Sequence, residues 1–101
     1  MYNYISIEWD EKKYKSNRDK HDLCFEDAVH VFQGETVTYV DDRYDYGEMR
    51  YITLGELNRR TVIIAHTYRQ TRIRIISMRK ANEREKKYYQ KRLKEIRRNE
   101  G

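Results

Sequence analysis

Three segments rich in β-branched and aromatic residues follow one another between residues 48 and 79, and their close spacing constrains the fold more than any other feature. The stretch 55–60 is typical of a hairpin connection, and 69–71 is a second short connection. Strands joined this closely pair as antiparallel neighbours, because a parallel pair needs a crossover of a dozen or more residues. The sequence therefore predicts an antiparallel meander of strands 48–54, 61–68 and 72–79.

Two further segments are typical of strands. Residues 5–9 alternate apolar and polar side chains, which is the period of a half-buried strand. Residues 36–40 are β-branched and aromatic, as strand residues commonly are.

Three helices are predicted around these strands. Asp10 can accept hydrogen bonds from free backbone N–H groups, which makes it a good N-cap for a short polar helix that runs to about His21. An apolar stripe at spacings of three and four indicates a second helix, ended by Gly34. Its members are Phe25, Ala28, Val29 and Phe32. Residues 80–98 contain no proline or glycine and predict a long third helix. The predicted fold is α+β, with two N-terminal helices, an antiparallel β-sheet meander and a C-terminal helix.

Charge is distributed unevenly along the chain. Residues 1–68 hold nine Lys/Arg and thirteen Asp/Glu, whereas 69–101 hold thirteen and four, so the two parts carry net charges of −4 and +9. This asymmetry indicates a polyanion or an acidic partner at the C-terminal third, although a basic helix that is merely solvated has the same composition. With 38% apolar and 39% charged residues, we expect one thin-cored domain over 1–101. Its basic helix end, at about 90–101, is expected to fray unless something binds it.

The sequence lacks the signals of a membrane, secreted or metal-binding protein. No stretch approaches the ~20 apolar residues that cross a bilayer, and residues 1–5 are not a basic region followed by an apolar run. Cys24 alone cannot form an internal disulfide or a cysteine-rich zinc site. His21, His30 and His66 are scattered, without an HExxH or Cys/His cluster. We therefore expect a cytoplasmic protein that uses no metal or cofactor.

Several short blocks of residues follow one another along the chain, and their order and spacing are informative as a set. The N-terminal blocks are Glu8-Trp9-Asp10-Glu11-Lys12, Asn17, Lys20-His21, Phe25-Glu26-Asp27-Ala28 and Val31-Phe32. The central block is Gly47-Glu48-Met49-Arg50 with Leu54-Gly55. The C-terminal block is Arg74-Ile75-Ile76-Ser77-Met78-Arg79-Lys80-Ala81, with Glu85 and Tyr89 behind it. No block is specific alone, but the ordered set, which covers residues 5 to about 90, resembles the BrnT family of toxins.

This resemblance implies a RelE-like fold and the toxin of a type II toxin–antitoxin system, an endoribonuclease that cleaves cellular RNA without a metal. It also implies neutralisation by a BrnA-like antitoxin with a ribbon-helix-helix DNA-binding domain, so that promoter DNA is met only through the complex. The chain departs from the family pattern at Asp22, where many members have glycine after the Lys20-His21 pair. The basic tail after Tyr89 also exceeds that pattern, so the resemblance implies no role for it.

RNA cleavage without a metal uses the substrate's own 2′-OH as nucleophile. It needs a base for that proton, cations for the extra charge of the phosphorane and an acid for the leaving 5′-oxygen, and it leaves a 2′,3′-cyclic phosphate. His21 is a candidate acid or base and Lys20 a candidate phosphate contact, unless both only satisfy the last carbonyls of a helix. Glu48 and Arg50 share a strand face, either as a base with a phosphate clamp or as a solvent-exposed ion pair.

The last predicted strand supplies the other candidates. Simple alternation places Arg72 and Arg74 on one face with Ile76 and Met78, and Arg79 on the other with Ile73, Ile75 and Ser77. Arg79 emerges at the strand end, where it suits a transition-state cation or could pair with Glu83 or Glu85. Arg72, Arg74 and Lys80 are expected to bind RNA phosphates, and Tyr89 is expected to stack on a base because its position matches the family. His66 lies on an apolar face and is expected to be a core residue.

Two other functions fit the composition. The +9 segment suits a non-catalytic basic nucleic-acid-binding module, and the basic helix also suits an inert protein that docks on an acidic partner. Recovery of intact RNA from a salt-sensitive complex would favour the first of these, and a stable protein complex without RNA affinity the second. RNA sequence preference, ribosome dependence, the acid and base assignment and oligomeric state have no signature in the sequence.

Overall fold

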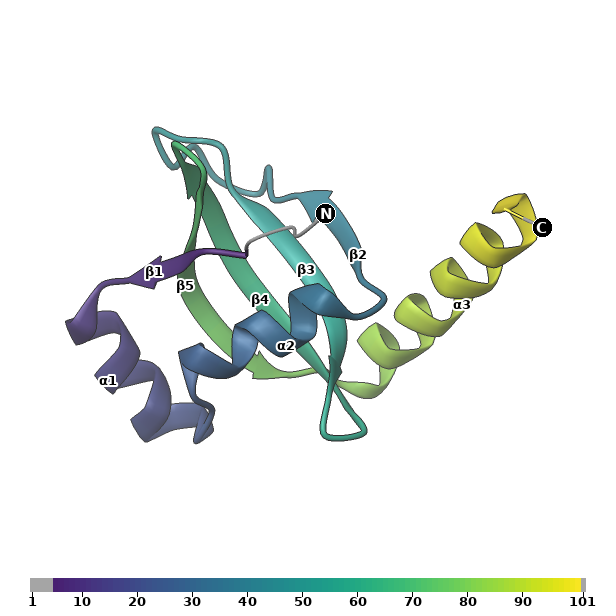
Figure 1. Cartoon of the computed structure of the whole chain (residues 1–101), viewed down its shortest axis with the longest axis horizontal. Helices are drawn as coiled ribbons and strands as arrows, with labels where there is room; N and C mark the ends of the chain where they lie inside the picture. Colours follow the sequence, from purple (N-terminus) through teal and green to yellow (C-terminus); the bar gives the residue numbers. More distant parts are fainter. Residues whose placement is uncertain (1–4, 101) are drawn as a thin grey trace.

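The computed structural model describes residues 5–100. The expectation that residues 1–5 are not a secretory signal therefore concerns a segment that, except for Ile5, lies outside the described residues. Within residues 5–100 the chain forms one mixed sheet accompanied by helices, an α+β arrangement (Figure 1). In chain order the elements are β1 (Ile7–Trp9), α1 (Glu11–His21), the 3-10 turn η1 (Phe25–Asp27), α2 (Ala28–Gln33), β2 (Val37–Val40), β3 (Tyr51–Leu57), β4 (Arg60–Arg69), β5 (Arg72–Lys80) and α3 (Glu83–Glu100).

The sheet has the strand order β1-β5-β4-β3-β2. The four strands from β2 to β5 form an antiparallel meander, as the short connections predict. β1 instead pairs in parallel with β5, with Ile7 opposite Ile73 and Trp9 opposite Ile75. The prediction of a purely antiparallel sheet is therefore wrong. The long connection between β1 and β5 leaves the chain free to return in the same direction.

The hairpin between β3 and β4 is tighter than predicted. Leu57 pairs with Arg60, so the residues from Gly55 onward belong to β3 and the turn consists of Asn58 and Arg59 alone. Both turn residues have positive φ, 51° and 67°, as in a type I′ turn. The backbone twist of such a turn matches that of the paired strands, so the register of β3 against β4 is fixed at its closed end.

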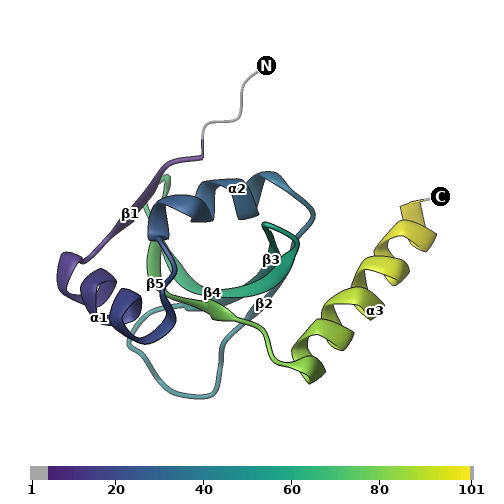
Figure 2. The ribbon, with the colours of Figure 1, turned by 90° about the horizontal axis from the view of Figure 1, so that it is seen from below.

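Each face of the sheet buries an apolar cluster, and the two clusters are covered by different helices (Figure 2). On one face, α1, η1 and α2 bury Phe25, Ala28 and Val31 completely. On the other face, α3 packs Tyr89 and Leu93 against the strands. The strand residues of this second cluster are Val37, Ile52, Leu54 and Ile63. The sheet therefore has an α2 face and an α3 face.

β5 contains one extra residue, Ile76, where its pairing with β4 shifts register between Ala65 and His66. Such a bulge resets the alternation of side chains along a strand. The α2 face receives Ile73, Ile75 and Met78, and the α3 face receives Arg74, Ser77 and Arg79. The face assignment predicted from simple alternation is therefore wrong. The bulge brings Arg74 and Arg79 to the same face.

α1 lies along the edge of β5. Its N-cap is Asp10, as predicted, and the carboxylate accepts a hydrogen bond from the Lys12 N–H at 2.8 Å. The Asn17 side-chain amide donates to the Met78 carbonyl at 2.8 Å and accepts from the Met78 N–H at 3.1 Å. These two bonds satisfy the backbone of β5 beyond the end of the short β1. α1 therefore runs toward the C-terminal end of β5 and ends there at His21.

α3 begins at Glu83 rather than at Lys80, which is the last residue of β5. Asn82 and Glu85 cap its start reciprocally. The Glu85 N–H donates to Asn82 Oδ1 at 2.8 Å, and the Asn82 N–H donates to Glu85 Oε1 at 2.9 Å. The helix continues to Glu100. None of the helices in residues 5–100 is long and apolar enough to cross a membrane.

Candidate active site on the α3 face of the sheet

The strand register arranges the side chains of the α3 face in three rows. The first row contains Glu8, Arg74 and Thr67, and Thr67 donates its hydroxyl to the Met49 carbonyl at 2.6 Å, next to Arg50. The second row is Ser77, Ala65, Ile52 and Tyr39, and the third is Arg79, Ile63, Leu54 and Val37. The loop between β2 and β3 lies on the same side of the sheet as α3 (Figure 2). The β5 and β4 members of the second row, Ser77 and Ala65, have small side chains and lie between the rows of Arg74 and Arg79.

Three arginines of this face are each paired with a glutamate. Ion pairs that are partly exposed add little to stability, because water screens both charges. A phosphate group can present two oxygens to a guanidinium as a carboxylate does, so it can take the place of the glutamate. The pairs are Arg74–Glu8 at 2.6 Å, Arg50–Glu48 at 3.2 Å and Arg79–Glu85 at 2.8 Å.

The Arg79–Glu85 pair has the best geometry of the three. Nη1 and Nη2 of Arg79 each donate to a different oxygen of Glu85 at 2.8 Å, and the arginine side chain stays 40% exposed. The hydrogen bonds from Arg79 lower the pKa of Glu85, and the same bonds raise the pKa of Arg79. The charge of Arg43, in the loop after β2, also acts on the pKa of Arg79 and lowers it slightly. Arg79 is therefore a permanent cation where β5, α3 and the loop after β2 meet.

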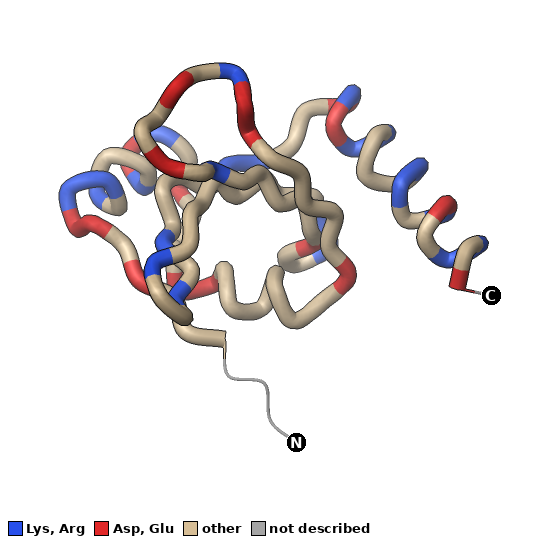
Figure 3. Tube along the Cα trace, turned by 90° about the horizontal axis from the view of Figure 1, so that it is seen from above, with Lys and Arg blue, Asp and Glu red and all other residues tan. Residues whose placement is uncertain are grey.

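That loop is organised around the buried carboxylate of Asp41. Asp41 accepts hydrogen bonds from Arg43 Nε at 2.8 Å, from Arg43 Nη2 at 2.9 Å and from the Tyr46 hydroxyl at 3.0 Å. These bonds, those from Arg43 above all, lower the pKa of Asp41 to about 2. The guanidinium carbon of Arg50 lies 4.2 Å from the centre of the Tyr46 ring. The acidic loop (red in Figure 3) thus links the Arg50 end of the α3 face to the Arg79 end.

The two predicted pairs, Lys20–His21 and Glu48–Arg50, occupy different places relative to Arg79. His21 lies four residues after Asn17, so it faces the same side of α1 and is half-buried at the C-terminal end of β5, whereas Lys20 is exposed. Lys20 and His21 are therefore near the end of β5 that carries Arg79, but among the described residues no hydrogen bond or salt bridge joins them to the Arg79 side chain. The Glu48–Arg50 pair lies in the first row, about 13 Å along β3 from the row of Arg79. Arg79 and Arg50 thus share the α3 face, whereas Lys20 and His21 are on a helix that packs with the α2-face cluster.

The remaining predicted phosphate contacts are spread around the sheet. Lys80 is opposite Val62, a residue of the α2-face cluster, so it lies on the other side of the sheet from Arg79. Arg72 is exposed at the start of β5, 3.7 Å from Glu8. Together with Arg74, Arg72 therefore extends the first row toward the β1 edge.

Two ring side chains have structural roles. Tyr89 is buried and donates its hydroxyl to the Glu35 carbonyl at 2.6 Å, which is incompatible with the predicted stacking on a base because stacking needs an open ring face. Its neighbour Tyr88 is exposed. His66 is fully buried on the α2 face, as predicted, and its Nε2 lies 2.7 Å from Thr53 Oγ1. Burial lowers the pKa of His66 to about 4, so this imidazole is neutral near pH 7. It lies on the opposite face of the sheet from Arg79.

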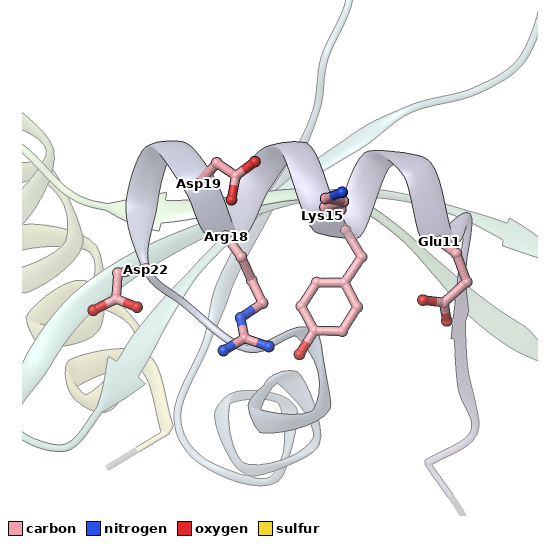
Figure 4. A pocket seen from close by; sticks show the side chains of 6 residues that line it. Glu11, Lys15, Arg18, Asp19 and Asp22 are labelled. Atoms are coloured by element: carbon pink, nitrogen blue, oxygen red, sulfur yellow. The ribbon is translucent and has the colours of Figure 1, made fainter.

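A hollow of about 480 Å³ lies along α1 (Figure 4). Its lining mixes carboxylates with cations and so favours neither an anion nor a cation. The lining residues are Glu11, Tyr14, Lys15, Arg18, Asp19 and Asp22. In the part of the chain from 5 to 100, no group of three or more His, Cys, Asp or Glu side chains could hold a metal ion. The α3 face remains the better candidate because it carries three arginines, one of which, Arg79, has a bidentate carboxylate partner that a phosphate can replace.

Comparison with known proteins identifies the family. Residues 9–85 match the family model described as the ribonuclease toxin BrnT of type II toxin–antitoxin systems. The chain belongs to the BrnT family. The resemblance inferred from the ordered sequence blocks is thereby confirmed. No curated protein sequence matches the chain.

The BrnT match contains Arg79, Glu85 and the whole loop between β2 and β3, and it ends within the first turn of α3. Glu85 is one of the two glutamates that the sequence offers as partners for Arg79, and the structure selects it. That Tyr39 and Arg43 share the α3 face with Arg79 could not be predicted from sequence, because it depends on the pairing of β2 at the far edge of the sheet. The acidic stretch 41–47 is recognisable as a loop, but nothing in its pattern shows that Asp41 is buried.

Proposed function

We propose that the chain is a metal-independent endoribonuclease whose reaction centre is built around Arg79 on the α3 face. The BrnT match supports ribonuclease activity, and the bidentate Arg79–Glu85 pair at the edge of an open, arginine-bearing face is the observation that carries the location. From the same family we infer a RelE-like fold and action in the cytoplasm.

The proposed reaction starts when a phosphodiester replaces Glu85 on the guanidinium of Arg79. The freed Glu85 carboxylate takes the proton from the 2′-OH, and the 2′-oxygen attacks the phosphorus. Arg79 stabilises the additional negative charge of the phosphorane. The bond from phosphorus to the 5′-oxygen then breaks, and that oxygen leaves with a proton from an acid. The products are a 2′,3′-cyclic phosphate and a 5′-OH.

We assign roles to the other predicted site residues from their positions in the structure. His21 is proposed to protonate the leaving 5′-oxygen and Lys20 to contact the phosphate, because α1 ends near the end of β5 that carries Arg79. The Glu48–Arg50 pair is proposed to bind a neighbouring phosphate after the guanidinium leaves its glutamate. Arg72 and Arg74 would continue this contact toward β1, and Lys80 would hold RNA that passes round the end of β5.

The type II classification implies an antitoxin. We propose a BrnA-like antitoxin with a ribbon-helix-helix domain, which covers the α3 face and brings the toxin to promoter DNA only as part of the complex. The net charge of +9 in residues 69–101 supports an acidic surface on this partner. Addition of the antitoxin should stop RNA cleavage, and cleavage that continues in the complex would contradict this part of the proposal.

A second candidate function is that of a non-catalytic nucleic-acid-binding module. One observation favours it: five exposed cations recur along α3 at spacings of three and four, and within residues 5–100 none belongs to a salt bridge. They are Arg84, Lys87, Lys91, Lys94 and Arg98. Such a stripe would bind RNA or DNA whether or not the chain cleaves it.

Incubation of the purified chain with single-stranded RNA in EDTA distinguishes the two candidates. We expect fragments that end in 2′,3′-cyclic phosphate, identified by mass spectrometry, and no cleavage of the same RNA when every 2′-OH is methylated. Intact RNA recovered from a salt-sensitive complex would favour the binding module. Cleavage that occurs only when Mg²⁺ is added would contradict a metal-independent mechanism.

A further inference from the structure

Next to the Arg79–Glu85 pair, β2 and α3 border a hollow of about 390 Å³. Most of its exposed lining is apolar, in contrast to the charged surface around it. The lining residues are Tyr39, Leu54, Arg84, Glu85 and Tyr88. Glu85 therefore belongs both to the hollow and to the ion pair with Arg79, so a group inside the hollow would lie beside whatever binds that guanidinium.

Two tyrosines shape the hollow. Tyr39 on β2 is 43% exposed and Tyr88 on α3 is 39% exposed. Their ring centres are 6.1 Å apart and their planes meet at 89°. Each ring thus keeps part of its surface open to solvent instead of closing over the other. Burial raises the pKa of Tyr39, so its hydroxyl remains protonated and can donate a hydrogen bond.

We infer that this hollow binds one nucleobase of single-stranded RNA, adjacent to the phosphate held by Arg79. The inference rests on the proposed function, and it adds a base-binding subsite to the reaction centre. Aromatic side chains bind unpaired bases by stacking, whereas bases inside a duplex have no free ring face. Arg84 at the rim and Arg79 beside Glu85 supply cations for the phosphates that flank the base.

The subsite is in part a property of this particular chain. The BrnT match ends at residue 85, so Tyr88 and four of the five cations of the α3 stripe lie beyond it, whereas Arg84 lies within it. Tyr89, the residue that the family resemblance suggests for stacking, is buried. The exposed neighbour Tyr88 is therefore the tyrosine of α3 that can meet a base, together with Tyr39 from the sheet.

Binding can be measured without cleavage. The probe is a single-stranded oligonucleotide in which every 2′-OH is methylated and one base is 2-aminopurine, whose fluorescence falls when it stacks. We expect quenching with the unmodified full-length chain, and a roughly 5- to 150-fold rise in Kd for Tyr39→Leu and for Tyr88→Leu. Tyr68→Leu is the matched control, because Tyr68 is 50% exposed and packs beside His66 on the α2 face. Circular dichroism and the unfolding midpoint establish that each variant is folded.

A substrate lacking one base separates direct stacking from an indirect effect of the variants. Removal of the base that occupies the hollow should weaken binding to the unmodified chain but not to Tyr39→Leu, because the interaction is already lost. In cleavable RNA, Tyr39→Leu and Tyr88→Leu should change which positions are cut, whereas Tyr68→Leu should cut the same positions as the unmodified chain.

The outcomes distinguish the subsite from the proposed function. RNA cleavage with unchanged positions and unchanged Kd in both tyrosine variants would overturn the subsite and leave the ribonuclease standing. Binding of the probe without any fluorescence change would overturn it too and would leave the hollow to a protein side chain. Tyrosine-dependent quenching without cleavage of any RNA would support the base site and reject the ribonuclease.

Discussion

Asp22 has a backbone conformation that most side chains avoid. It follows the last residue of α1 with φ 53° and ψ 42°, and its N–H donates to the Arg18 carbonyl at 2.9 Å. Glycine is the residue that adopts this left-handed conformation without a steric cost, which explains why glycine suits this place after the Lys20-His21 pair in the family. The unusual aspartate keeps the helix end and adds strain.

Asp22→Gly should therefore stabilise the chain. We expect the free energy of unfolding in urea to rise by about 0.5–1 kcal/mol, since relief of the strained φ outweighs the entropy that glycine adds to the unfolded chain. Lys15→Gly, in the exposed middle of the same helix, should lower it by about 0.5–1 kcal/mol. A lower stability for Asp22→Gly than for the unmodified chain would show that the aspartate makes a compensating contact.

Glu85 allows a test of the proposed base. Glu85→Gln removes the proton acceptor but keeps an oxygen for the Asn82 N–H, so the helix cap survives. The single-turnover rate of RNA cleavage should fall at least about 100-fold, as expected when a general base is lost. Glu83→Gln, which alters only an exposed pair with Lys86, should leave the rate unchanged. An unchanged rate in Glu85→Gln would assign the base to another residue.

Among the helices and strands, the sequence predicts the features that depend on nearby residues. It does not predict the features that depend on pairing between distant segments. The meander and the N-cap at Asp10 follow from connection lengths and a capping side chain. The parallel pairing of β1 joins segments more than sixty residues apart and has no local signal. The bulge at Ile76 also has no recognisable sequence pattern, yet it places Arg74 and Arg79 on the same face. Candidate residues could therefore be named from the sequence, but which of them share a face could not.

The packing of α2 on β3 depends on a glycine. A Cβ added to Gly55 would lie 2.5 Å from Val31 Cγ1 and 3.3 Å from Thr36 Cγ2, so the buried Val31 side chain, or α2 with it, would have to shift. Gly55→Ala should lower the unfolding free energy by about 1–3 kcal/mol, the usual cost of overpacking. At Gly34 the nearest atom to an added Cβ is 3.6 Å away, so Gly34→Ala is the control and should cost much less. Equal urea midpoints for the two variants would contradict this packing.

The whole molecule separates charge in space as well as in sequence. The cations of α3 extend away from the sheet, while the acidic loop lies close to its arginines (Figure 3). On the α3 face and the loop beside it, four carboxylates of the described residues hold arginines, so the proposed reaction centre is electrostatically satisfied before RNA binds. Phosphate binding then exchanges one anion for another, without leaving any guanidinium bare.

The stability of the whole fold should depend on pH through His66. Its pKa is lowered from 6.5 to about 4 by burial, and Thr53, Phe32, Tyr51 and Tyr68 surround it without any charged group. The unfolded chain therefore binds the proton first, so this contribution to stability is complete above pH 6.5 and is lost as the pH falls toward 4. Between pH 7.5 and 5.0 the loss should be about 2 kcal/mol.

Urea unfolding at these two pH values measures that loss, and His66→Gln is the control. Glutamine can still bond to Thr53 but does not titrate, so its stability should change much less over the same range. The lowered pKa values of Asp41 and Glu85 act only at more acid pH and do not interfere. Equal slopes for the unmodified chain and His66→Gln would show that the imidazole is not desolvated.

The most direct test of the central claim compares two arginines of the same sheet. Arg79 lies on the α3 face, whereas Arg60 is opposite Leu57, a residue of the α2-face cluster, so Arg60→Ala removes an equal charge from the other side. In EDTA, Arg79→Ala should cleave single-stranded RNA about 100- to 1000-fold more slowly than the unmodified chain, with an unchanged circular dichroism spectrum. Arg60→Ala should cleave at the unmodified rate. Full activity of folded Arg79→Ala would contradict the claim that this guanidinium meets the scissile phosphate.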